Sequence, residues 1–166
     1  DVLIAALAQL PPDVQLVLPG PYHTLQANLP DELGQLIARY GLEGRVHLPG
    51  ATDAPETYVR AADLFAMPSE QEGMPNALLE AMACGLPCCA SEIGGVVDVL
   101  TDAKNGLLSA AGDADALAAN LRMLLDNPVR ARALGQAARD TIQQRYTWSS
   151  IVPQVEALYA QLALKQ

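Results

Sequence analysis

The sequence predicts an α/β fold, in which a mostly parallel sheet is flanked by helices. Short apolar runs alternate with longer amphipathic stretches, which is typical of strands that cross over through helices. Turn-forming residues follow the apolar runs directly, for example at Pro19-Gly20-Pro21 and Pro49-Gly50. The chain has 166 residues, of which 51% are hydrophobic, and this is enough to bury one core. We therefore expect a single domain over residues 1–166.

The apolar runs predict five strands. Most of them are bounded by proline, glycine or polar residues that end regular structure. In chain order, the predicted strands cover residues 15–18, 46–48, 64–67, 87–90 and 106–108.

The stretches around these strands predict eight helices. Pro11 and Pro12 end the first helix, and Gly85 ends the central one, because proline and glycine are poor helix formers. In chain order, the predicted helices cover residues 2–10, 31–40, 56–62, 75–84, 96–100, 115–125, 128–145 and 150–164.

The segment from Glu72 to Glu80 is the most informative part of the chain. Pro75 suits the first position of a helix, where the missing N–H costs nothing. The helix should therefore begin next to Gly73, with its free N–H groups and the positive end of its dipole open to an approaching group. Such a helix start predicts a phosphate-binding site.

The two acids bracket this predicted phosphate site. Glu80 should lie roughly 7.5 Å further along the helix axis than Pro75, while Glu72 stands in the loop outside. A nucleoside diphosphate sugar has hydroxyls at both ends and charge in the middle, and carboxylates accept hydrogen bonds from hydroxyls. Spacing alone also fits a structural alternative, because acids near a helix start are favoured by the dipole.

Residues 67–95, MPSEQEGMPNALLEAMACGLPCCASEIGG, resemble the donor-binding core of the GT-B glycosyltransferases. The resemblance is closest to the large retaining group called glycosyltransferase family 4, or glycosyl transferases group 1. It continues through residues 98–100, 105–108, 127–128 and 145–148, in the order of the family. The resemblance implies the Rossmann-like C-terminal half of a GT-B enzyme, which transfers a hexosyl group from a nucleoside diphosphate sugar with retention.

The resemblance also implies roles for the residues of the motif. Glu72, the residue that we expect to serve catalysis, would bind hydroxyls of the donor sugar, and Glu80 would hold the ribose diol. The segment between them would meet the sugar and the β-phosphate, at Gly73, Met74, Pro75, Asn76, Ala77 and Leu78. In this family the leaving phosphate is thought to take the proton of the acceptor, and no metal or other cofactor is needed.

Four loops should line one crevice, because they follow the carboxyl ends of predicted strands. They cover residues 19–22, 49–51, 69–76 and 91–95. Gly50 is a candidate edge for the nucleotide base, although a tight turn would also need glycine there. Gly94-Gly95 fits either a phosphate-binding turn or a simple strand-to-helix turn.

The chain begins at Asp1, inside what the resemblance implies is the first helix of the donor domain. Relatives carry upstream a strand, an arginine and a lysine that clamp the diphosphate, and an N-terminal acceptor domain. Without that central strand, we expect either closure of the flanking strands or pairing with a second copy, giving a homo-oligomer. We expect weak donor binding and no transfer by the chain alone, and peripheral membrane contact only in a full-length enzyme.

Charge and hydropathy exclude other classes. The net charge of −9 argues against nucleic acid as a partner. No apolar run reaches the length of a membrane span and we recognise no signal peptide, so we expect a cytoplasmic protein. Before Glu80 the cationic side chains are Arg39, Arg45 and Arg60, so a diphosphate would depend mainly on backbone N–H groups.

Several other residues have plainer interpretations. Cys84, Cys88 and Cys89 fit small buried hydrophobic positions. The Asp113-Ala114-Asp115 pattern fits a helix cap better than a metal site. His23 and His47 lack a visible catalytic partner. The arginines of the penultimate helix fit a solvated face, or a face toward acidic lipid or the missing domain; they are Arg130, Arg132, Arg139 and Arg145.

Two other functions remain open from the sequence. One is a non-catalytic α/β module that binds a nucleotide or a protein in the same crevice. The other is a sugar-nucleotide epimerase of similar architecture, which the details of the motif disfavour.

Overall fold

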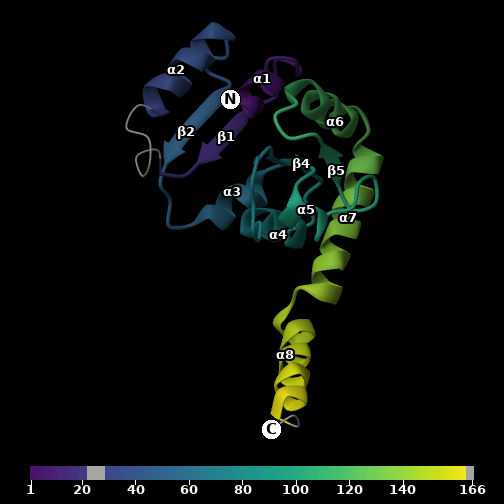
Figure 1. Cartoon of the computed structure of the whole chain (residues 1–166). Helices are drawn as coiled ribbons and strands as arrows, with labels where there is room; N and C mark the ends of the chain where they lie inside the picture. The colour runs from purple at the N-terminus through teal and green to yellow at the C-terminus, as the bar shows by residue number, and fades with distance from the viewer. Residues whose placement is uncertain (22–28, 164–166) are drawn as a thin grey trace.

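A computed structural model describes residues 1–21 and 29–163, and within them five parallel strands form two sheets (Figure 1). The first sheet pairs β1 (Leu16–Pro19) with β2 (Val46–Gly50). The second has the order β3-β4-β5. Its strands are β3 (Phe65–Met67), β4 (Cys88–Ser91) and β5 (Leu107–Ser109). The predicted α/β class and all five predicted strands are confirmed.

Eight helices are present at the predicted places in the described residues. They are α1 (Val2–Leu7), α2 (Leu29–Arg39), α3 (Pro55–Ala61), α4 (Asn76–Ala83), α5 (Gly94–Val97), α6 (Ala114–Asp126), α7 (Pro128–Arg145) and α8 (Trp148–Ala163). However, α1 ends at Leu7 instead of residue 10, and α5 begins at Gly94 instead of residue 96. The helix predicted to begin at Pro75 begins at Asn76, because the ψ of 76° at Pro75 is not helical and this residue serves as the N-cap. Its predicted end at Gly85 is confirmed.

Helices cover both faces of the three-stranded sheet. Along β4, Cys89 packs into a cluster with α1 and α6, whereas Cys88 and Ala90 pack into a second cluster with α4, α5 and α7. This alternation follows from the two-residue period of a strand. The second cluster buries Leu78 and Met82 completely, which fixes α4 against the sheet.

The two sheets remain separate in the described residues. β1 pairs with β2 but not with β3, so the expectation that the flanking strands close up is wrong. β1 lies on the side of its sheet that is nearer the second sheet (Figure 1). Side-chain packing connects the sheets instead, because one apolar cluster includes Leu16, Val46 and Leu107. Pairing with a second copy stays a prediction.

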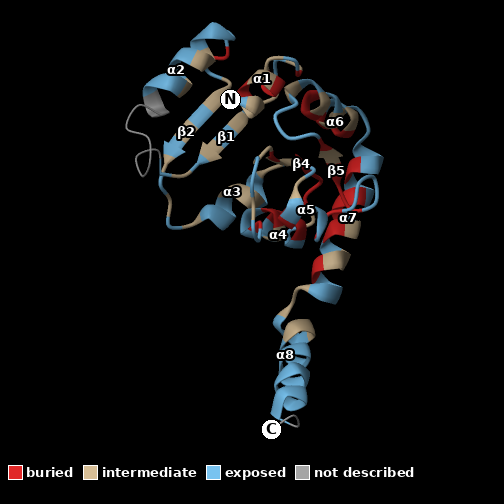
Figure 2. Ribbon diagram, in the orientation of Figure 1, coloured by how far each residue is buried: buried red, intermediate tan, exposed pale blue. Residues whose placement is uncertain are grey.

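The last helix differs from the rest of the fold. α8 extends away from the sheets and carries no buried residue (Figures 1 and 2). Its exposed apolar side chains include Trp148, which is 82% exposed, and Tyr159, which is 69% exposed. Among the described helices, none combines the length and apolar character needed to cross a membrane.

Candidate functional site

The candidate site begins in the loop between β3 and α4. Within this loop Glu72 is half-buried, and its Oε1 accepts a hydrogen bond of 2.9 Å from the hydroxyl of Ser69. This bond restrains the carboxylate before any ligand arrives. Ser69 was not predicted from the sequence, and the signal that could have found it is a serine three residues before the acid.

The leading end of α4 is open to solvent. Pro75 is buried and anchors this end, but Asn76 and Ala77 are exposed and Met74 is 57% exposed. The Asn76 N–H donates to the carbonyl of Met74, at 2.9 Å. Within the described residues, the N–H groups at Gly73, Met74, Ala77 and Leu78 make no hydrogen bond. Leu78 is fully buried, so an anion would reach the other three groups first.

These open N–H groups satisfy the chemical requirement for binding an anion. The first N–H groups of a helix have no acceptor inside the helix, and the dipole adds positive potential there. α4 has no side-chain cap to occupy them. The N–H groups at the predicted anion site are therefore open to a ligand, and binding of an anion there stays a prediction.

Glu80 lies on the exposed side of α4. It is four residues beyond Asn76, which corresponds to about 6 Å along the axis. Within the part of the chain that the structure describes, its carboxylate makes no hydrogen bond or ion pair. This acid is therefore available to a ligand, whereas Glu72 is restrained by Ser69.

The loop between β3 and α4, which carries Glu72, is called the acid loop. The turn after β4 packs directly against it. A methyl group on Gly95 would collide with the carbonyl oxygen of Gly73 and would lie 2.8 Å from that of Glu72. At Gly94, by contrast, an added methyl group meets no atom within 4 Å. Gly95 is therefore required for the close approach of two of the four predicted loops, and this steric reason was missed from the sequence.

The other two predicted loops begin at the ends of β1 and β2, and residue 22 of the first loop lies outside the described residues. The N–H of Gly20 donates to the carbonyl of Gly50 at 2.9 Å, and Pro19 is the register partner of Gly50. Gly50 has a φ of +82°, a left-handed conformation that favours glycine. The backbone conformation is therefore sufficient reason for a glycine at this position, as expected if Gly50 forms a tight turn. Contact of Gly50 with a nucleotide base stays a prediction.

Of the three cationic side chains before Glu80, Arg45 is engaged away from this site. Arg45 is part-buried and donates to the backbone carbonyls of Leu7, Leu10, Pro11 and Val14, so it clamps the segment between α1 and β1. Arg39 is exposed at the end of α2, and Arg60 lies in the last turn of α3. An anion at α4 would depend on backbone N–H groups.

Two further predictions from the sequence can be compared with the structure. The carboxylate of Asp113 accepts a 2.8 Å hydrogen bond from the N–H of Ala116, which confirms a cap on α6. His47 Nε2 lies 2.9 Å from Gln15 Oε1, while His23 lies outside the described residues. No cluster of three potential metal ligands occurs in residues 1–21 and 29–163.

The cysteines divide into two environments. Cys88 and Cys89 are buried, as expected, but Cys84 is exposed, so the expectation of burial is wrong for Cys84. It is the C-cap of α4 and lies beyond the buried face of that helix. Burial, reinforced by the charge of Asp102, raises the pKa of Cys89 to about 12, and burial raises the pKa of Cys88 still further.

Comparison with known proteins places the chain among glycosyltransferases. Residues 1–141 match the family described as Glycosyl transferases group 1. The chain is 34% identical to the D-inositol 3-phosphate glycosyltransferase of Xylanimonas cellulosilytica, over 97% of this chain and 39% of that protein. It is 33% identical to the N-acetyl-alpha-D-glucosaminyl L-malate synthase of Bacillus anthracis, over 75% of this chain and 33% of that protein.

Solved structures show the same relationship. Anabaena HepE in complex with UDP superposes with a TM-score of 0.93 at 30% identity, over 96% of this chain and 44% of that chain. Sucrose-phosphate synthase from Thermosynechococcus elongatus superposes with a TM-score of 0.88 at 34% identity, over 99% of this chain and 42% of that chain. The chain thus spans less than half the length of each of these relatives.

Proposed function

Because this chain belongs to the group 1 glycosyl transferases, as the C-terminal domain of a GT-B fold, we propose that it binds the nucleoside diphosphate sugar donor. The observation that carries the proposal is the open start of α4 between Glu72 and Glu80. A related protein, Anabaena HepE, has been solved with UDP and with UDP-glucose. This supports a uridine nucleotide as the first donor to test.

The diphosphate binds at the open end of α4. Three exposed residues, Gly73, Met74 and Ala77, offer N–H groups without an acceptor in the described chain, and the helix dipole adds positive potential. The same groups stabilise the negative charge that develops on the departing diphosphate. A backbone site suits this chain, because Arg45 is engaged with backbone carbonyls.

The two acids fix the ends of the donor. Glu72, held by Ser69, accepts hydrogen bonds from hydroxyls of the sugar, and Glu80 accepts them from the ribose diol. Gly50 borders the base, at the end of β2. The donor is thereby held at its sugar, its phosphates and its nucleoside.

The reaction is transfer with retention at the anomeric carbon. The bond between that carbon and the β-phosphate oxygen breaks, and a bond to the acceptor oxygen forms on the same face. The acceptor proton passes to an oxygen of the leaving phosphate, so Glu72 positions the sugar and need not act as a nucleophile. No metal or other cofactor takes part, and the acceptor binds to a part of the enzyme outside this chain.

Titration calorimetry tests the proposal. The chain is titrated with UDP-glucose, and then with GDP- and ADP-sugars. Binding of at least one of these donors is expected, with Glu80→Gln weakening it about tenfold or more because the ribose loses a charged acceptor. Glu156→Gln, which removes an exposed charge from α8, is the matched control and should bind as the unmodified chain does.

Ser69→Ala tests recognition of the sugar separately from recognition of the nucleotide. It should weaken UDP-glucose binding by about two- to tenfold, because the Glu72 carboxylate is no longer restrained, and leave UDP binding unchanged. Failure of every donor to bind at millimolar concentration would remove the proposed function and leave only the fold. Equal weakening by Glu80→Gln and Glu156→Gln would remove the role given to Glu80.

A further inference from the structure

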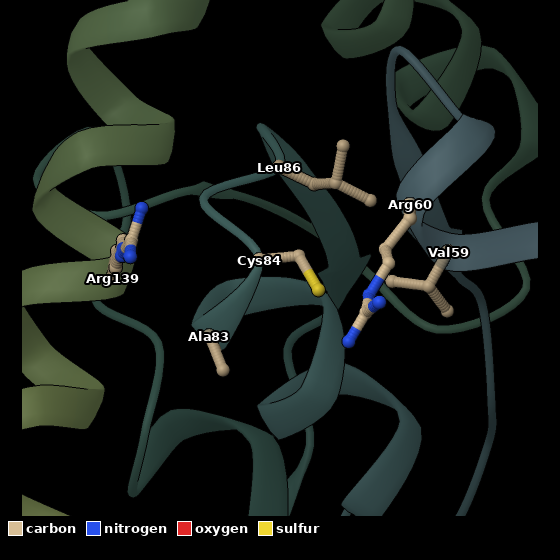
Figure 3. Close-up of a pocket in the computed structure, with 6 residues that line it drawn as sticks. All are labelled: Val59, Arg60, Ala83, Cys84, Leu86 and Arg139. Atoms are coloured by element: carbon tan, nitrogen blue, oxygen red, sulfur yellow. The ribbon is translucent and has the colours of Figure 1, made fainter. Parts of the chain in front are cut away.

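A cavity lies at the opposite end of α4 from the acid loop. It has a volume of about 310 Å³, is open to solvent, and is bounded by α3, the C-terminal turn of α4 and α7 (Figure 3). Its lining residues are Val59, Arg60, Ala83, Cys84, Leu86 and Arg139. Cys84 lies eight residues beyond Asn76, about 12 Å along the helix, so this cavity is distinct from the proposed donor site.

Two arginines bring uncompensated positive charge to this cavity. Arg60 projects from α3 and Arg139 stands on the other side, on α7 (Figure 3). Within the described residues, neither guanidinium makes a hydrogen bond or an ion pair, and no acid lines the cavity. This is unusual in a chain with ten cationic and nineteen acidic side chains, where acids are the more common neighbours.

The arginines are not needed to cap the nearby end of α4. The N–H groups of Cys84, Gly85 and Leu86 already donate to carbonyls of the last turn, at 2.9–3.1 Å. This closed arrangement is a Schellman motif, which satisfies the carbonyls from the backbone. A methyl group on Gly85 would lie 3.8 Å from Cδ of Arg139, so the stem of Arg139 packs beside this turn while its guanidinium stays unpaired.

We propose that the cavity between Arg60, Cys84 and Arg139 is a second anion site that binds a small molecule carrying a phosphate group. Each guanidinium presents a planar fork of donors that matches phosphate oxygens. A phosphate monoester carries a charge of about −1.5 to −2 at pH 7, which balances two guanidiniums, whereas one carboxylate would balance half of that charge.

The cavity also offers apolar surface to a ligand. Val59, Ala83 and Leu86 give it apolar surface beside the charged groups. A volume of about 310 Å³ is at the small end of ligand pockets, which span roughly 300–1,000 Å³. A sugar phosphate or free phosphate fits this description.

The rate at which Cys84 is chemically modified can show whether a ligand occupies the cavity. Cys84 is exposed, lines the cavity, and its side chain is directed toward the side that carries Arg60 (Figure 3). Cys88 and Cys89 are buried, so a neutral maleimide should modify Cys84 first in the native chain. The rate of this modification is measured with glucose 6-phosphate, with inorganic phosphate, and with sodium chloride at equal ionic strength.

Glucose 6-phosphate or inorganic phosphate should slow the modification at least threefold, in a saturable manner. The phosphate compound that protects at the lower concentration identifies the source of the phosphate group. The protection should be lost in Arg60→Gln and Arg139→Gln, each compared with and without phosphate, because each substitution removes one of the two guanidiniums. Both residues are exposed, so these variants should fold.

Two results would overturn the proposal. One is slowing by the phosphate compounds that does not exceed slowing by sodium chloride. The other is protection that persists when both arginines are replaced. Glu80→Gln should leave the protection intact, and Arg60→Gln should leave UDP-glucose binding intact, so failure at one site is distinguishable from failure at the other.

Discussion

The two ends of α4 differ in whether their backbone polar groups are hydrogen-bonded. At its N-terminal end the backbone is open, because the N–H groups of Gly73, Met74 and Ala77 have no acceptor in the described chain. At its C-terminal end the backbone is closed by Gly85 and Leu86, and the unpaired groups belong to side chains instead. The middle of the helix is buried at Leu78, Ala81 and Met82, which holds both ends in place.

This difference indicates what each end can bind. An open helix start offers fixed backbone donors that suit a phosphate, with acids on either side for hydroxyls. A closed helix end offers no backbone group, so recognition there depends on the two arginines of the cavity. Substitutions near the start of α4 should therefore change donor binding, whereas substitutions at its C-terminal end should change stability and leave donor binding unchanged.

Gly95→Ala should have the largest effect on the open end. The added methyl group collides with the carbonyl of Gly73, so the acid loop must shift. We expect a loss of about 1–3 kcal/mol in the free energy of unfolding, together with loss of UDP-glucose binding. Urea denaturation and calorimetry measure both effects.

Gly94→Ala is the matched control, because nothing lies within 4 Å of the added group. It should leave stability and binding close to those of the unmodified chain. If Gly95→Ala also bound UDP-glucose normally, the acid loop would not need its present position, and the account of the open end would be wrong.

Gly85→Ala should affect folding at the closed end without affecting donor binding. Gly85 has a φ of +78°, where a Cβ costs about 1–2 kcal/mol. The same substitution at Gly34, inside α2, should raise stability by up to about 1 kcal/mol, since alanine is the better helix former. A reduced affinity of Gly85→Ala for UDP would show that the two ends are coupled.

The buried cysteines after the closed end should make stability fall at alkaline pH. In the folded chain, burial and the charge of Asp102 raise the pKa of Cys89 to about 12, and burial raises that of Cys88 further. The unfolded chain releases these protons near pH 8.5, so the stabilisation is full below that pH and is lost as the pH rises toward the folded pKa. Between pH 8.0 and 9.5 we expect a loss on the order of 1 kcal/mol from each of these two thiols.

Urea midpoints at the two pH values measure this loss. Cys89→Ala should reduce the difference between them, and Cys84→Ser, at an exposed position, should not. A difference that Cys89→Ala leaves unchanged would assign the alkaline effect to other groups.

The local signals in the sequence predicted the secondary structure well. Gly85 predicted the end of α4, and Asn127-Pro128 coincides with the start of α7, because these residues act on the backbone at their own positions. The start of α4 was misplaced by one residue, since Pro75 has the non-helical ψ of a cap.

Features that depend on distant parts of the chain were not predictable in the same way. The role of Gly95 depends on the approach of the acid loop, which belongs to another strand connection. The exposure of Cys84 depends on which side of α4 faces the sheet. The separation of the two sheets also depends on distant residues, because one apolar cluster joins the sheets while β1 and β3 do not pair.

The open start of α4 can be tested most directly by following the backbone amides. We predict that addition of UDP to the ¹⁵N-labelled chain shifts the amide resonances of Gly73, Met74 and Ala77 more than other resonances, because the diphosphate accepts their hydrogen bonds. Uridine, which lacks phosphate, should leave these three resonances unchanged. Equal shifts with uridine, or UDP-dependent shifts confined to other parts of the chain, would contradict the account.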